Sequence, residues 1–376
     1  MKLSAKIQSI AGSQTVAFTA LIQQLRQEGR KIIDLAVGEP QFDTPAAVID
    51  TTKIALDSQK TRYGPVNGLS ELRTQLAEQF SGYTIDNILI TNGSKQALFM
   101  IFQIICDPAD EVIIPTPFWV SFIEQVKLAG GKPVPVATKD HQLDCEAIEH
   151  AVTPRTRAIL INSPNNPSGA VYPMADLQKI ARLADDHNLF IVADEAYNAF
   201  VYDGHAHANM FDIERARKRV IVTRSFSKSY SMTGFRIGYV AAPGQIIAAL
   251  SKIQSHLTGN VCTFAQYGAL VALSLDGHLL SARHSALQQK RDLAFEYVSK
   301  LFDCLKPQGA FYLFPDVSRV LKNDETSAAL AERLLKQAGV AVVAGEAFGM
   351  PKHLRISFAV SEENLKNGLE QIAEVL

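Results

Sequence analysis

Short apolar runs alternate with helix-like segments between about residues 85 and 240. Each run is rich in Val, Ile and Leu and ends in turn-forming or polar residues, a pattern that predicts a buried strand. Strands that alternate with helices along a chain indicate a mostly parallel sheet with helices on both faces. The strands predicted for this sheet are 88–91, 111–114, 158–161, 189–193, 219–223 and 237–241.

The remaining pattern predicts a second, smaller α+β unit. A long helix is expected over about 277–302, and a terminal helix is expected to begin after Ser361. The strands expected in this unit are 311–314, 340–343 and 354–358. An amphipathic helix over 17–28 and a strand over 31–37 open the chain. The predicted division is an N-terminal arm that joins the small domain (1–44), a large domain (45–276) and a small C-terminal domain (277–376).

Composition and charge narrow the function classes. The 376 residues carry 37 basic and 38 acidic side chains, so the net charge is −1 and no basic surface for nucleic acid is indicated. No apolar run reaches the roughly 18–20 residues of a membrane span, and the first residues lack the apolar core of a signal peptide. Four widely spaced cysteines are typical of reduced thiols, and the nine histidines form no metal-ligand set. We expect a cytoplasmic protein without a metal site.

The segment that follows the predicted strand 219–223 carries the most specific chemistry. It contains Ser225, Ser227, Lys228 and Arg236. A lysine positioned at the end of a buried strand can condense with an aldehyde. The neighbouring hydroxyls and the guanidinium can hold a phosphate dianion. An aldehyde and a phosphate in one cofactor indicate pyridoxal 5′-phosphate.

Other predicted strands end in residues that suit the same cofactor. Gly93 and Ser94 join a strand to a helix, where free backbone N–H groups attract an anion, although an N-cap without a ligand is equally common. Trp119 follows a strand at the edge where open α/β sheets bind ligands, and its flat ring can stack on a pyridine. Asp194 ends a very apolar strand, where a carboxylate is costly unless a cation such as a protonated ring nitrogen pairs with it. A helix N-cap is the alternative for Asp194.

The order of these motifs resembles that of the class I pyridoxal-phosphate aminotransferases. Residues 225–238 match the lysine-attachment pattern of that family position by position. The Asn-Pro-Ser-Gly run at 166–169 and the Leu-Arg-Ile-Ser run at 354–357 match two further family motifs. The resemblance implies an α/β protein of fold type I of the pyridoxal-phosphate-dependent transferases. Its large domain would hold a mostly parallel seven-stranded sheet between helices, beside a smaller α+β domain.

The resemblance also assigns roles around the cofactor. Lys228 would hold the cofactor as a Schiff base and then, as the catalytic amine, move the substrate's Cα proton. Asp194 would pair with the ring nitrogen, while Asn166 and Tyr197 bond the ring oxygen and Trp119 stacks on the ring. The implied cofactor-binding set is completed by Tyr63, Gly93, Ser94, Lys95, Ser225, Ser227 and Arg236.

For the substrate, the resemblance implies that Gly38 and Arg355 bind the α-carboxylate. An arginine suits this role because its planar fork can grip both carboxylate oxygens. Trp119 and Asn166 would also contact the substrate. Tyr63 would reach the phosphate of the neighbouring subunit's cofactor, which implies a homodimer with shared active sites.

Substrate choice rests on a closer likeness to the bacterial branch of the aspartate aminotransferases. In that branch a lysine and hydroxyls of the amino-terminal segment meet the side-chain carboxylate, which here implies Lys95, Ser13 and Thr15. A solvated lysine is the alternative for Lys95. Ser94 stands where the branch has a second glycine, which leaves an aromatic, kynurenine-type or methionine aminotransferase open. Prephenate also fits as an amino acceptor.

Two further classes of protein share parts of this pattern. A fold-related carbon–sulfur lyase would share the lysine, the aspartate and the arginine. An aminotransferase-like domain of a transcription regulator would follow a helix-turn-helix module, and the fewer than forty residues before Gly38 are too few for one. We therefore expect an aminotransferase that works by two half-reactions, between an L-amino acid (aspartate or glutamate first) and a 2-oxo acid.

Overall fold

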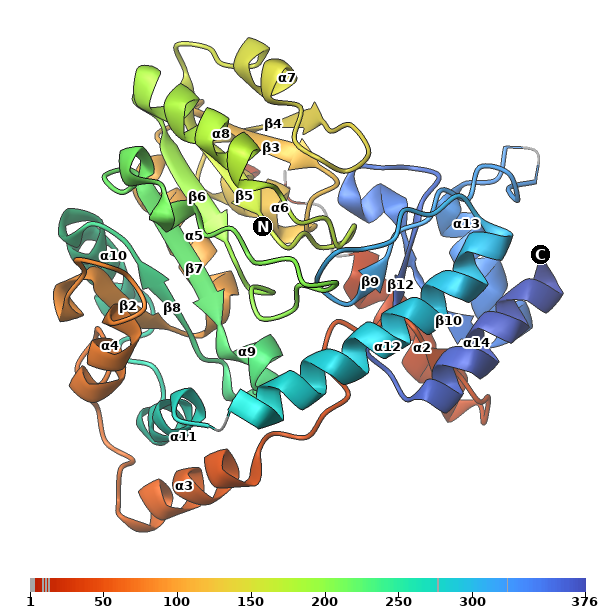
Figure 1. Ribbon diagram of the computed structural model, residues 1–376, viewed down its shortest axis with the longest axis horizontal. Coiled ribbons are helices and arrows are strands. Elements are labelled where there is room, and N and C mark those ends of the chain that lie inside the picture. Colours follow the sequence, from red (N-terminus) through yellow and green to blue (C-terminus); the bar gives the residue numbers. More distant parts are fainter. Residues whose placement is uncertain (1–3, 9, 11, 13, 276, 323) are drawn as a thin grey trace.

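The computed structural model describes residues 4–8, 10, 12, 14–275, 277–322 and 324–376 (Figure 1). A seven-stranded sheet with the order β2-β8-β7-β6-β5-β3-β4 lies at its centre. The strands are β2 (Ile88–Thr91), β3 (Glu111–Thr116), β4 (Lys132–Ala137), β5 (Thr156–Asn162), β6 (Phe190–Asp194), β7 (Val220–Ser225) and β8 (Gly238–Ala241). Neighbours from β4 to β7 pair in parallel, and β8 runs antiparallel to β7 and β2. The predicted fold class is confirmed.

Helices cover both faces of this sheet because successive strand residues point to opposite sides. In β5, Ala158 and Leu160 pack on the face covered by α5, α6 and α10, whereas Ile159 and Ile161 pack on the face covered by α4, α8 and α11. These helices are α4 (Ser70–Ala77), α5 (Gly93–Ile105), α6 (Ser121–Leu128), α8 (Met174–Asp186), α10 (Gly244–Leu257) and α11 (Thr263–Leu273). Two more helices, α3 (Ala46–Asp57) and α7 (Cys145–His150), flank them.

A smaller unit lies beside the sheet (Figure 1). It holds an antiparallel sheet with the order β11-β12-β9 and a parallel pair, β1 with β10. Its elements are α2 (Gln14–Gln27), β1 (Ile33–Asp34), α12 (Gly277–Leu301), β9 (Tyr312–Leu313), α13 (Ser327–Arg333), β10 (Val340–Ala341), β11 (Val343–Ala344), β12 (Leu354–Ser357) and α14 (Glu362–Val375). The pairing of β1 with β10 brings the start of the chain into the small unit, as expected for 1–44. The domain boundaries at 44/45 and 276/277 stay a prediction.

Two differences from the predicted strands have physical reasons. The pattern did not predict β4, because Pro133 and Pro135 interrupt it; β4 is an edge strand, where the missing donors of proline are tolerated. The strand expected over 31–37 forms only at Ile33–Asp34. Beyond it, the carbonyl oxygens of Ala36 and Gly38 accept hydrogen bonds from side chains instead of a neighbouring strand.

The structure also bears on the expectations about membrane spans, metal sites and cysteines. In the part that the structure describes, no helix combines the length and apolarity needed to cross a membrane. Among the same residues, no three or more potential metal ligands lie together in a group. The four cysteines are free.

Candidate active site

A pocket of about 560 Å³ opens where the parallel strands end, between the large sheet and the small unit. The carboxyl ends of parallel strands all meet at one edge, which is why open α/β sheets bind ligands there. Twelve predicted site residues line this pocket: Gly38, Ser94, Lys95, Trp119, Asn166, Asp194, Tyr197, Ser225, Ser227, Lys228, Arg236 and Arg355. Side chains that lie far apart in the sequence are thus brought to a single cavity.

Lys228 lies on the short helix α9 (Phe226–Ser229), directly after β7. Ser225 begins the turn, since its hydroxyl accepts a hydrogen bond of 3.1 Å from the backbone N–H of Ser227. The Lys228 Nζ donates to the carbonyl oxygen of Gly38. Burial, helped by the nearby positive charge of Arg355 and opposed by Glu39, lowers the pKa of Lys228 to about 8. A neutral amine is therefore accessible near neutral pH.

Arg236 and the start of α5 form a site for an anion. An added Cβ at Gly93 would lie 2.6 Å from the Arg236 Nη2, so only glycine lets the guanidinium lie over the helix N-terminus. Arg236 adopts a left-handed conformation with φ of 55° and donates to the carbonyl oxygen of Thr233 at 2.8 Å and to the Ser227 hydroxyl at 3.5 Å. No side chain caps α5 at Asn92. Free helix amides, a hydroxyl and a guanidinium therefore converge, which suits a phosphate.

Asp194 is the last residue of β6 and is buried. Its carboxylate accepts a hydrogen bond of 3.2 Å from the Ala196 N–H, and no ion-pair partner lies within 4 Å among the described residues. Burial raises its pKa to about 7. No α-helix of the described chain begins at Asp194, so the N-cap alternative is wrong. A cationic ligand atom would restore the charged carboxylate.

Asn162 holds the backbone of Asp194 from the neighbouring strand. It lies opposite Asp194 in the β5–β6 register and donates to the Asp194 carbonyl oxygen at 3.0 Å. Its own side-chain oxygen accepts from the Asn166 N–H at 3.0 Å, which fixes the loop after β5. Asn162 was not among the site residues predicted from the sequence. Its place directly after the predicted strand 158–161 was the available signal.

Arg355 lies on β12 with only 6% of its surface exposed, so it is not the solvent-facing charge that an arginine in an alternating strand usually is. Its Nη1 donates to the Asn166 Oδ1 at 3.1 Å and its Nη2 to the Ala36 carbonyl oxygen at 2.7 Å. The guanidinium lies 4.3 Å over the ring of Tyr312. Its Nε has no hydrogen-bond partner, and no described carboxylate pairs with it. A buried cation with an unused donor is suited to bind a carboxylate.

Trp119 and Lys95 lie together at another wall of the pocket. The Lys95 Nζ is 5.0 Å from the centre of the Trp119 ring. Burial, and then the charge of Arg236, lower the pKa of Lys95. A flat ring and a second cation thus accompany Lys228 and Arg355 in the same cavity.

Comparison with known proteins gives the family. The family described as "Aminotransferase class I and II" matches residues 30–372. The chain belongs to this family. It is 41% identical to the probable aspartate/prephenate aminotransferase of Aquifex aeolicus, over 100% of this chain and 98% of that one. It is 37% identical to the aspartate aminotransferase of Bacillus subtilis, over 99% and 98%.

Solved structures agree with this assignment. The aspartate aminotransferase of Thermus thermophilus with maleate has a TM-score of 0.96 and 40% identity, with both chains covered completely. This aminotransferase therefore falls in the aspartate/prephenate subfamily, and the predicted family and enzyme class are confirmed. The family depends on pyridoxal phosphate. These findings set aside the carbon–sulfur lyase.

The other four predicted site residues are not among those that line the pocket of this aminotransferase. Tyr63 is 99% exposed and does not line the pocket. Gly93 lies behind Arg236 and shapes the anion site by leaving room for it. Ser13 lies outside the described residues. Thr15 belongs to α2, but its side chain also lies outside what the structure describes.

The aminotransferase pocket also holds residues that the sequence did not single out. Tyr312 and Phe348 line it from the small unit, and Glu39 lines it beside Gly38. The Tyr312 hydroxyl lies 3.0 Å from that of Tyr197. Tyr312 was missed because it sits within an apolar run that predicts only a core strand. An added Cβ at Gly38 would meet just the Tyr312 hydroxyl at 3.6 Å, so any need for glycine there comes from a ligand.

The buried Asp194 gives the cofactor-free aminotransferase a characteristic pH dependence. Its folded pKa of about 7 lies above the ordinary 3.8, so its contribution to stability is present below about pH 4 and is lost as the pH rises through 7. Asp194→Asn removes this loss and is expected to gain about 2–3 kcal/mol relative to the wild type between pH 5 and pH 8. Urea unfolding of the wild type and the variant at pH 5 and at pH 8 measures this gain. If the difference in unfolding free energy between the two proteins were the same at both pH values, Asp194 would not be uncharged at acidic pH.

Proposed function

We propose that this aminotransferase binds pyridoxal 5′-phosphate in the pocket and moves an amino group between aspartate or glutamate and a 2-oxo acid, in two half-reactions. The observation that carries the substrate class is the pair of cations in one cavity. Arg355 has an unused donor for one carboxylate, and Lys95 is available for a second. A dicarboxylic amino acid is the ligand that uses both.

The relatives support this substrate class. The Thermus thermophilus structure is described with maleate, a dicarboxylate. The Aquifex aeolicus relative is named for aspartate and prephenate. Prephenate also carries two carboxylates, so the same two cations suit it as amino acceptor.

The residues present fit the cofactor. Arg236, Ser94, Ser225 and Ser227 would hold its phosphate at the start of α5, since they supply hydroxyl and guanidinium donors beside free helix amides. Asp194 would hold the ring nitrogen, a cation that the buried carboxylate otherwise lacks. Each contact satisfies a group that the protein leaves without a charged partner.

The faces and the ring oxygen of the cofactor's pyridine ring also have candidate partners in the pocket. Trp119 would cover the ring, while Asn166 and Tyr197 would bond the ring oxygen. Burial and the neighbouring Tyr312 raise the pKa of Tyr197 well above its usual value, so Tyr197 keeps its proton and can donate it in a hydrogen bond.

The bound cofactor supplies an aldehyde that accepts the amino group and a ring that withdraws electrons from the substrate's Cα. Arg355 binds the α-carboxylate and thereby orients the Cα–H bond. The pKa of Lys228, lowered to about 8, leaves a fraction of its Nζ uncharged near neutral pH, and this amine takes the Cα proton and returns it to the product. Asp194 stays charged and keeps the ring nitrogen protonated.

We further propose a homodimer in which Tyr63 completes the partner's phosphate site. A tyrosine that is 99% exposed in one chain has its whole ring available to a second subunit. This role accounts for its position outside the pocket of its own chain.

Absorption spectroscopy tests the proposed function. The purified protein, reconstituted with pyridoxal phosphate, is expected to absorb between ~300 and 500 nm and to lose its longest-wavelength band when aspartate is added without an acceptor. Phenylalanine is expected to react more slowly, because it leaves Lys95 unpaired. Failure of the protein to bind a chromophore would contradict the proposed function. A faster reaction with phenylalanine than with aspartate would contradict the proposed substrate class.

Lys95→Gln is the matched variant in the same measurement. It is expected to slow the reaction with aspartate by about tenfold, the size of one lost charge-assisted hydrogen bond, and to leave phenylalanine within about twofold. An equal loss for both amino acids would place Lys95 on the cofactor and not on the substrate side chain.

A further inference from the structure

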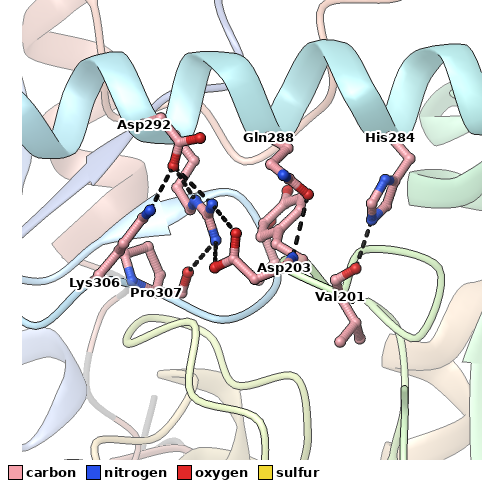
Figure 2. Close-up of polar contacts among 10 residues, drawn as sticks. Val201, Asp203, His284, Gln288, Asp292, Lys306 and Pro307 are labelled. Atoms are coloured by element: carbon pink, nitrogen blue, oxygen red, sulfur yellow. Dashed lines mark hydrogen bonds and ion pairs between the residues drawn. The ribbon is translucent and has the colours of Figure 1, made fainter. Parts of the chain in front are cut away.

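Side chains on one face of α12 make polar contacts with the loop that follows β6 (Figure 2). His284, Gln288 and Arg291 are spaced i, i+4 and i+7, so they share a side of the helix. His284 lies in hydrogen-bond contact with the carbonyl oxygen of Val201, and the Gln288 oxygen accepts from the Asp203 N–H at 3.2 Å. We call residues 195–204 the β6 loop. About two turns of α12 thus contact the far end of this loop.

Arg291 makes the most extensive of these contacts, an ion pair with Asp203. Its side chain is 0% exposed, and its two terminal nitrogens each lie 2.7 Å from a carboxylate oxygen of Asp203. Such a two-pronged pair fixes orientation as well as distance. The same guanidinium donates to the carbonyl oxygen of Pro307 at 3.2 Å. It therefore joins the β6 loop to a second segment, residues 307–312.

These two segments run side by side from Arg291 to the pocket. The Tyr202 N–H donates to the Gln308 carbonyl oxygen at 2.8 Å, and the Ala310 N–H donates to the Phe200 carbonyl oxygen at 3.0 Å. At the pocket end, the hydroxyls of Tyr197 and Tyr312 lie 3.0 Å apart. A ladder of backbone hydrogen bonds thus links the Arg291–Asp203 ion pair to two side chains of the active site.

We propose that Arg291 is a positioning residue of this aminotransferase. Through its ion pair with Asp203, it holds the β6 loop against residues 307–312 and so fixes the Tyr197 hydroxyl in the pocket. Arg291 touches no pocket residue itself and acts through this ladder. The proposal rests on the proposed function only in the step where Tyr197 meets the ring oxygen of the cofactor.

Arg291 offers a matched control, because it pairs with two carboxylates. Asp292 also lies 2.7 Å from the guanidinium and is 45% exposed, against 40% for Asp203. Asp292, however, belongs to α12 and makes its other ion pair with Lys306, so it does not hold the β6 loop. Asp203→Asn should therefore disturb the pocket, whereas Asp292→Asn should not, although each removes one charge from the same arginine.

Hydrogen exchange of the cofactor-free protein tests the loop directly. In Asp203→Asn, backbone amides of residues 197–204 are expected to exchange about tenfold faster than in the wild type, because the loop opens locally once its anchor is lost. In Asp292→Asn the same amides should keep their wild-type rates. Equal exchange in the two variants would overturn the proposal, and this test does not depend on cofactor binding.

The bound chromophore gives a second measurement. A hydrogen bond donated by Tyr197 favours the ionised ring oxygen and lowers the pH at which the chromophore titrates. Asp203→Asn is expected to raise that midpoint by about half a pH unit, and Asp292→Asn to leave it in place. An unchanged midpoint in Asp203→Asn would refute the positioning role. A wild-type protein without any chromophore would refute the proposed function instead.

Discussion

Replacing Lys228 by alanine is expected to slow the conversion of bound cofactor by aspartate by about 10⁴-fold or more. The Lys228 Nζ is the amine that we propose to take the substrate's Cα proton. The same amine is the point to which the cofactor attaches. Its half-buried position and its pKa of about 8 prepare it to carry the proton. Single-turnover absorbance changes with saturating aspartate measure the loss.

The variant should still bind the cofactor. The phosphate site at Arg236 and Ser227 and the carboxylate of Asp194 do not depend on the lysine. Lys228→Arg is the matched control, since it keeps the length and charge of the side chain but holds its proton too tightly to act as a base. A rate in either variant within tenfold of the wild type would place the proton transfer on another group.

Replacing Arg355 by lysine is expected to lower kcat/KM for aspartate by about 10²-fold to 10³-fold. Lysine keeps the charge but loses the planar fork, and a buried charged pair is worth roughly 2–5 kcal/mol, with 1.4 kcal/mol per tenfold. Steady-state kinetics with both aspartate and 2-oxoglutarate measures the effect. The value of kcat/KM should fall for both substrates, since each carries an α-carboxylate.

Arg333→Lys is the control for that substitution. Arg333 also lies in the small unit, is 11% exposed, and forms a two-pronged pair with Glu325 at 2.9 and 3.0 Å. It does not line the pocket. Its replacement should cost stability but leave kcat/KM within about twofold. Equal kinetic losses in the two variants would mean that Arg355 acts through the stability of the small unit.

The sequence by itself determined the sheet and the edge that carries the chemistry. Buried parallel strands leave long apolar runs that end abruptly in polar residues, and these ends come together whatever the details of packing. Lys228, Asp194 and Asn166 each follow such a run, so their meeting in one pocket was predictable. The family resemblance added what each would do.

Only the tertiary structure decided the contacts made across the two units. Arg355 sits in an alternating strand, a pattern equally typical of a solvated charge, and its burial depends on Tyr312 and Asn166 from distant parts of the chain. Asp203 and Arg291 are 88 residues apart, and neither belongs to a motif. Periodicity reports which face of an element is apolar, but a contact between elements depends on how they dock, and docking leaves no local signal in the sequence.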